Sequence, residues 1–70
     1  MRYAVVIESG DANLSGYVPD LPGCVATGAT EAEVMERLRE AIVQHVQGLR
    51  EDGLPVPAPL THCGYVDAAA

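Results

Sequence analysis

The side chains with the most reactive chemistry in this sequence are two thiols and two imidazoles, at Cys24, Cys63, His45 and His62. A cysteine thiolate next to a histidine can act as a nucleophile. Such thiolates form in electropositive surroundings, whereas this chain carries ten acidic residues against four arginines, a formal net charge of −6. Cys24 also opens a predicted strand, where a small apolar residue packs well. We therefore expect inert thiols and no catalytic residue.

The same four side chains are also candidate metal ligands. Zinc sites draw their ligands from short repeats such as C-x-x-C or H-x-x-x-H, and the sequence contains neither. His62 and Cys63 are neighbours in a predicted strand, so their side chains point to opposite faces. His45 lies at the border of an apolar helical stripe. The sequence thus predicts no metal site and no cofactor.

Carboxylates could hold Mg²⁺ for phosphoryl transfer if several of them converged. Three lie at a predicted strand end and in loops, and three lie on the outer face of a predicted helix: Glu8, Asp11 and Asp20, and Glu33, Glu36 and Glu40. Nothing in the pattern brings the two groups together, and such charges usually form a solvated surface. The four glycines between residues 10 and 28 do not form a phosphate-binding motif, because no helix start with a lysine follows them.

The elements that position these groups are organised around the run Tyr17-Val-Pro-Asp-Leu-Pro-Gly-Cys24. Pro19 presets the backbone for a turn at Asp20, and Pro22-Gly23 supplies the proline and the positive-φ residue of a type II turn. The run therefore predicts a rigid loop between two short strands, at residues 14–18 and 24–27.

A first strand is predicted for residues 2–8. Its residues Tyr3, Val5 and Ile7 share one face, which we expect to lie in the core. The turn-forming residues 9–13 then lead back into the second strand. The three strands should form an antiparallel meander.

A helix is predicted to begin after Thr30, which forms a capping box with Glu33. Gly53 should take the left-handed conformation at the helix end, and Gly48 should weaken the last turns by about 1 kcal/mol relative to alanine. One face of the helix is apolar and should cover the sheet, through Val34, Met35, Leu38, Ala41, Ile42, Val46 and Leu49.

These elements predict an α+β fold: a three-stranded antiparallel meander, one helix packed on one face, and a fourth strand after the helix. Three prolines in five residues should keep the connector behind the helix extended. We assign one domain to residues 1–70, with a core at 1–53, a proline-rich connector at 54–60, a final strand at 61–67 and a disordered tail at 68–70.

Size and charge limit the function classes. A chain of 70 residues buries only about 60% of its unfolded surface, and oligomerisation is one way to bury more. The acidic balance argues against nucleic-acid binding, which needs lysine or arginine on one face. No signal peptide or membrane-spanning run is visible. We expect a cytoplasmic protein with reduced thiols.

Several segments together resemble the HicB-like antitoxin domain, over about residues 1 to 60. They are the run at residues 17–24, Gly28 and Thr30 before the helix, Glu40-Ala-Ile42 within it, residues 51–59 after it, and the opening residues 3–8. The resemblance implies a β-β-β-α-β fold, a truncated relative of the ribonuclease H fold without its catalytic machinery. It also implies a HicA-like partner, a small basic toxin that cleaves messenger RNA and is blocked when the antitoxin covers its active site.

The resemblance implies a non-enzymatic antitoxin of a type II toxin-antitoxin pair. We expect Asp20, Leu21 and Gly23 to contact the toxin, because a loop held rigid by two prolines loses little entropy on binding; the alternative is a plain turn that serves only the fold. Many family members continue into a DNA-binding domain, and this chain ends at Ala70 without one, so we expect no direct DNA binding. The alternative functions are an orphan ligand-binding or assembly module, or a residual ribonuclease H-type nuclease that uses Glu8 and Mg²⁺.

Self-association is the last expectation. One helix on a three- or four-stranded sheet leaves the other face and at least one edge strand uncovered. We therefore expect a homodimer, or a tetramer, joined through sheet edges or the free sheet face. The acidic side of the helix should stay in solvent, because bringing two such faces together is repulsive.

Overall fold

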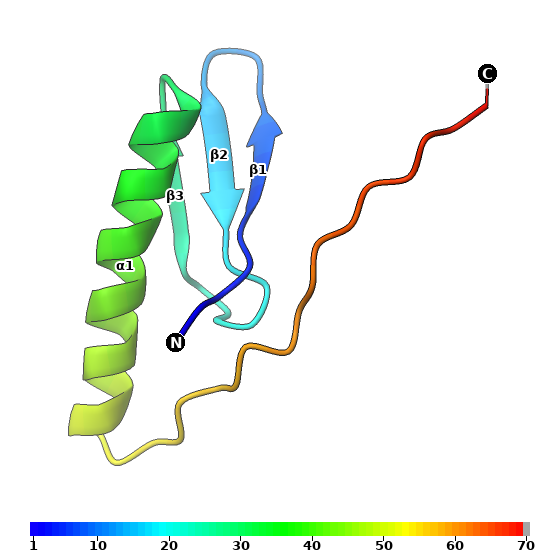
Figure 1. Ribbon diagram of the computed structural model, residues 1–70. Helices are drawn as coiled ribbons and strands as arrows, with labels where there is room; N and C mark the ends of the chain where they lie inside the picture. The colour runs from blue at the N-terminus through cyan, green and yellow to red at the C-terminus, as the bar shows by residue number, and fades with distance from the viewer. Residues whose placement is uncertain (70) are drawn as a thin grey trace.

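The computed structural model describes residues 1–69, and its strands and helix follow the predicted order. Strand β1 comprises Val6–Ser9, β2 Leu14–Tyr17, β3 Val25–Gly28, and helix α1 Glu31–Glu51. The strands form one antiparallel sheet in the order β1-β2-β3, and α1 packs on β2 and β3 across one face (Figure 1). The α+β meander predicted from the sequence is confirmed.

Strand β1 is shorter than predicted. It begins at Val6, which pairs with Tyr17, the last residue of β2. After Tyr17 the chain turns into the loop, so residues 2–5 have no strand beside them and the ladder stops. The predicted strand over residues 2–8 is therefore wrong in its first half. Tyr3, Val5 and Ile7 nevertheless pack against the core, as their shared face predicts.

The core is built from five buried side chains, with partly buried apolar residues packed around them: Val18, Leu21, Cys24, Val34 and Leu38. Two of the five come from the inner face of α1. The other three come from the loop between β2 and β3. Helix and loop therefore meet at the centre of the molecule.

Gly16 in the middle of β2 lets the helix lie directly on the sheet. A Cβ atom at this position would lie 2.7 Å from Val34 Cγ1, 2.9 Å from Leu38 Cδ1 and 3.2 Å from the Val6 carbonyl oxygen. At the two shorter distances a Cβ atom would force the Val34 and Leu38 side chains to shift. The bare glycine backbone is thus the surface on which the helix packs.

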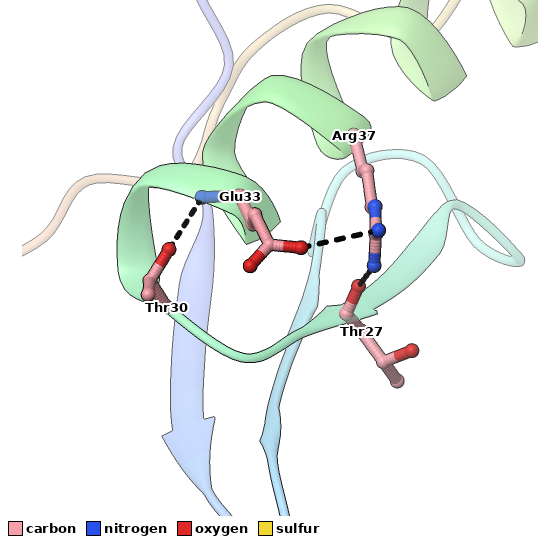
Figure 2. Close-up of polar contacts among 4 residues, drawn as sticks. All are labelled: Thr27, Thr30, Glu33 and Arg37. Carbon is pink, nitrogen blue, oxygen red and sulfur yellow. Dashed lines mark hydrogen bonds and ion pairs between the residues drawn. The ribbon is translucent and has the colours of Figure 1, made fainter.

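The start of α1 has half of the predicted capping box. The Thr30 hydroxyl oxygen accepts a hydrogen bond from the Glu33 N–H at 3.1 Å (Figure 2). The Glu33 carboxylate does not complete the box, because it pairs with Arg37 at 3.2 Å, and Arg37 also donates to the Thr27 carbonyl of β3 at 2.6 Å. The same arginine therefore connects the first turns of the helix to the edge of the sheet.

The helix ends as the sequence predicts. Gly53 has φ of +70°, and the N–H groups of Gly53 and Leu54 donate to the carbonyls of Arg50 and Leu49. This pair of bonds is a Schellman motif, which satisfies carbonyls at the helix end.

Beyond the helix, residues 54–69 form neither helix nor strand; residues 54–61 pass along the body, and residues 62–69 run away from the sheet (Figure 1). The predicted strand at 61–67 is therefore wrong for the chain as described. A strand exists only where its backbone bonds to a neighbouring strand, and this segment has none within residues 1–69. The predicted disordered tail includes Ala70, which lies outside the described residues; Ala68 and Ala69 are exposed.

We predict that Gly16→Ala lowers the free energy of unfolding by about 1–3 kcal/mol, because the added methyl overpacks the contact with Val34 and Leu38. Chemical denaturation followed by circular dichroism measures the change. Gly48→Ala is the matched control. No atom lies within 4 Å of a Cβ at position 48, so this change should stabilise the helix, by about 1 kcal/mol. Equal stability of Gly16→Ala and the native chain would contradict the close packing.

Candidate partner-binding site

The loop between β2 and β3 consists of two consecutive turns that share Leu21. The Leu21 N–H donates to the Val18 carbonyl, and the Cys24 N–H donates to the Leu21 carbonyl, each at 3.1 Å. The Val18 N–H also donates to the Cys24 carbonyl at 3.1 Å and closes the loop at its base. Gly23 has φ of +88°, as the predicted type II turn at Pro22-Gly23 requires. The loop is thus fixed by its own backbone as well as by two prolines.

This double turn sorts the side chains of the loop. Every third residue points inward, so Val18, Leu21 and Cys24 are buried at 2%, 0% and 3% exposure. The residues between them are exposed or half-buried on the outside: Pro19, Asp20, Pro22 and Gly23. The outer surface that a partner would meet is therefore held in place by the core itself.

The three predicted contact residues occupy different places in this arrangement. Gly23 is exposed at the tip of the second turn, and Asp20 is half-buried. The Leu21 side chain is fully buried in the core, which corrects its predicted place on the contact surface. Two short turns in succession reverse the direction of the side chain at their shared residue, and the sequence pattern did not show this. Leu21 holds the loop, while Asp20 and Gly23 face outward.

Asp20 is bound to a residue far along the chain. Its Oδ2 accepts a hydrogen bond from the Thr61 N–H at 2.9 Å, and its Oδ1 accepts one from the Thr61 hydroxyl at 2.8 Å. We call this pair the Asp20–Thr61 clasp. The backbone N–H of Thr61, with its hydroxyl, lowers the pKa of the Asp20 carboxyl below its usual value. The carboxylate therefore links the loop to the chain beyond the helix.

A second contact fixes the proline-rich connector. The Tyr3 hydroxyl donates to the Pro57 carbonyl at 2.6 Å and so joins the N-terminal segment to the connector. Sequence reasoning missed both Tyr3 and Thr61 as anchors. The bonded residues lie 54 and 41 positions apart, and no local pattern signals such a pair.

The reactive side chains do not assemble. Cys24 is buried, and burial raises the pKa of its thiol, which disfavours the thiolate. Cys63 is exposed on the segment that follows the clasp. Among residues 1–69 no group of three or more histidine, cysteine, aspartate or glutamate residues could hold a metal ion. Within the same residues, no helix is long and apolar enough to span a membrane.

Two of the four arginines are paired with glutamates on their own helix, Arg37 with Glu33 and Arg39 with Glu36. The Arg39 guanidinium donates two hydrogen bonds to Glu36, at 2.7 and 3.2 Å, and lowers the pKa of that carboxyl. Pairs this exposed add little stability, but they neutralise half of the positive charge. The remaining surface is dominated by carboxylates, as the net charge of −6 requires.

A groove of about 620 Å³ runs between the N-terminal segment and the second half of α1. Its lining is mostly apolar and includes Met1, Tyr3, Ile42, Val43 and Val46. Met1 and Val43 are exposed at 74% and 59%. The short strands leave this part of the helix uncovered, so the apolar stripe predicted for the helix is only partly used by the sheet.

The features described above define a class: small acidic α+β domains in which one helix packs on a three-stranded meander and a rigid loop contributes to the core. A model of the HicB-like antitoxins of bacterial toxin-antitoxin systems matches residues 3–68. The chain therefore belongs to the HicB-like antitoxin family, which confirms the resemblance found in the sequence.

Three relatives support this assignment. A chain of the solved HicA3 and HicB3 toxin-antitoxin complex has a TM-score of 0.72 and 32% identity, with 86% of this chain and 70% of that chain covered. The UPF0150 protein Ta0767 of Thermoplasma acidophilum is 33% identical over 61 residues, 81% of this chain and 84% of that protein. A 14.9 kDa protein encoded in the rep-hol intergenic region of Haemophilus phage HP1 is 39% identical over 57 residues, 81% of this chain. The match spans 43% of the phage protein's length.

We predict that the Thr61 amide resonance reports ionisation of Asp20. A carboxyl whose pKa is lowered by folding stabilises the fold fully above its unfolded value, about 3.9, and loses this contribution as the pH falls through the lower folded value. The Thr61 amide proton should therefore move upfield below about pH 4 in NMR spectra, as the protonated carboxyl accepts more weakly.

Asp20→Asn should abolish this titration, because a carboxamide does not ionise in this pH range, although it keeps one acceptor oxygen for Thr61. Asp11→Asn, in the exposed hairpin turn, is the control and should leave the Thr61 titration unchanged. A Thr61 amide that does not respond to pH in the native chain would contradict the clasp.

Proposed function

We propose that this chain is the antitoxin of a type II pair and neutralises a small basic, messenger-RNA-cleaving toxin of the HicA type by covering its active site. It acts in the cytoplasm as a binding protein, without catalysis of its own and without direct DNA binding by this chain. Membership of the HicB-like antitoxin family carries the proposal. Similarity to a chain of the HicA3 and HicB3 complex supports the choice of partner.

The outer face of the loop suits a binding role. Its backbone bonds, its prolines and its three buried side chains fix its shape before any partner arrives. A surface that is already ordered loses little conformational entropy on binding. We place Asp20 and Gly23 in the contact surface, with Leu21 beneath them as the side chain that holds the loop on the core.

The charge of the chain suits the proposed partner. An acidic surface attracts a basic ribonuclease and speeds their encounter, and the attraction weakens as salt screens it. Covering a positively charged active site with this surface would also exclude RNA, which needs the same charges. The complex should therefore form faster at low ionic strength.

A substitution at the loop tip tests this surface. Gly23→Asn adds a side chain where no atom lies within 4 Å, and asparagine tolerates the left-handed backbone. We expect it to weaken binding of the basic toxin encoded beside this gene at least tenfold by calorimetry. Co-expression of the variant should fail to relieve the toxin's growth arrest.

Gly53→Asn is the matched control, because Gly53 also has positive φ with no atom within 4 Å and lies outside the loop. It should bind like the native chain. Undiminished binding by Gly23→Asn would remove the loop from the contact surface. A native chain that neither binds the toxin nor relieves growth arrest would overturn the proposed function.

The apolar groove supports a second candidate, an orphan module that binds a small apolar ligand between Met1, Tyr3 and Val46. Val43→Glu, on the groove wall, separates the two candidates. It should abolish ligand binding in the orphan case and leave toxin neutralisation unchanged in the antitoxin case.

A further inference from the structure

The segment formed by residues 62–67 is exposed although it carries large apolar side chains. Tyr65 is 99% and Val66 94% exposed, and none of the six residues is in a helix or strand. Exposed neighbouring apolar residues on an extended chain are a feature of segments that pair with a sheet edge. The 62–67 segment thus has the composition of a strand but no strand beside it.

The segment is aimed away from its own sheet. The connector is stiffened by Pro55, Pro57 and Pro59, and it is held to the body at two points, by Tyr3 at Pro57 and by Asp20 at Thr61. Residues 62–69 continue outward, away from the sheet (Figure 1). A stiff, anchored connector therefore holds the 62–67 segment away from its own sheet.

The β1 edge of the sheet is the less occupied of the two edges. At the other edge, the Thr27 carbonyl of β3 already accepts a hydrogen bond from Arg37. Strand β1 pairs with β2 on one side only in the described chain, and no side chain is bonded to its outer backbone among the contacts of residues 1–69. The connector also passes near the N-terminal segment that leads into β1, because residues 2–4 line one hollow of about 510 Å³ together with residues 59 and 61–63.

We propose that two copies of this chain exchange their 62–67 segments, each segment adding a fourth strand to the β1 edge of the other copy. A two-fold symmetric pair satisfies both open edges at once, because each copy gives one segment and receives one. Tyr65 and Val66 then point to opposite faces of the sheet, where each packs beside the β1 side chains on its face, and the outer backbone groups of β1 gain partners. The strand that the sequence predicts at 61–67 thus forms between copies.

Proline scanning of the purified chain tests the exchange without any toxin, so the result does not depend on the proposed function. Tyr65→Pro removes a backbone donor and fixes φ, and it should convert a dimer into a monomer at micromolar concentration by light scattering. Its helix signal in circular dichroism should stay native, because residue 65 contacts nothing in the core. Ala68→Pro, outside the segment, should remain a dimer. A monomeric native chain, or a dimeric Tyr65→Pro variant, overturns the proposal.

Disulfide trapping distinguishes exchange from pairing within one chain. Cys63 supplies the thiol in the segment. A longer, tagged chain with Cys63→Ser and a new cysteine at Val6, Glu8 or Ser9 of β1 is mixed with the native chain. A mixed disulfide of the size of one tagged plus one native chain supports exchange.

Absence of that product at all three positions overturns the proposal. A second variant, Glu8→Cys with Cys63 retained, carries both thiols in one chain. If its disulfide forms only within a single copy, the proposal is also overturned.

Discussion

The fold depends on the loop between β2 and β3, which supplies three of the five buried core side chains, Val18, Leu21 and Cys24. Such a small core cannot lose one of them without a cavity, because replacing a buried leucine by alanine typically costs about 2–5 kcal/mol. The helix contributes the other two, Val34 and Leu38, which pack on the bare backbone of Gly16 and form one cluster with the loop side chains. Helix and loop therefore stabilise each other.

The same loop also carries the proposed contact surface. Its sequence must therefore satisfy both core packing and partner binding. Residues that face outward, such as Pro22 and Gly23, alternate with buried residues whose replacement would disrupt the core. Partner choice can therefore vary only at the outer positions, while the shape of the loop stays fixed. The charge around the loop adds long-range attraction without altering its geometry.

Local signals predicted much of this structure. The type II turn at Pro22-Gly23, the Thr30 cap and the left-handed Gly53 were all predicted from residue types, because each depends on the backbone preferences of one or two residues. Long-range contacts left no such trace. The Asp20–Thr61 clasp joins residues 41 positions apart, and no pattern in either segment marks its partner.

Two of the errors, at residues 61–67 and at Leu21, have the same origin. The 61–67 segment has strand composition, but composition does not reveal whether an edge lies beside it, and within one chain none does. Leu21 lies in a loop, where an exposed side chain is expected, but the two consecutive turns direct its side chain into the core. In both cases the local pattern described the residues themselves but did not determine which parts of the chain lie beside them.

The clasp couples the two proposed interfaces, because Asp20 belongs to the loop and Thr61 directly precedes the 62–67 segment. A toxin that donates hydrogen bonds to the Asp20 carboxylate competes with Thr61 and frees the connector. A toxin that binds while Asp20 and Thr61 stay hydrogen-bonded holds the connector in place more firmly instead. Coupling between two binding events is reciprocal, so strand exchange must change toxin affinity by the same factor by which toxin changes exchange. The sign of that factor depends on whether the carboxylate of Asp20 stays with Thr61.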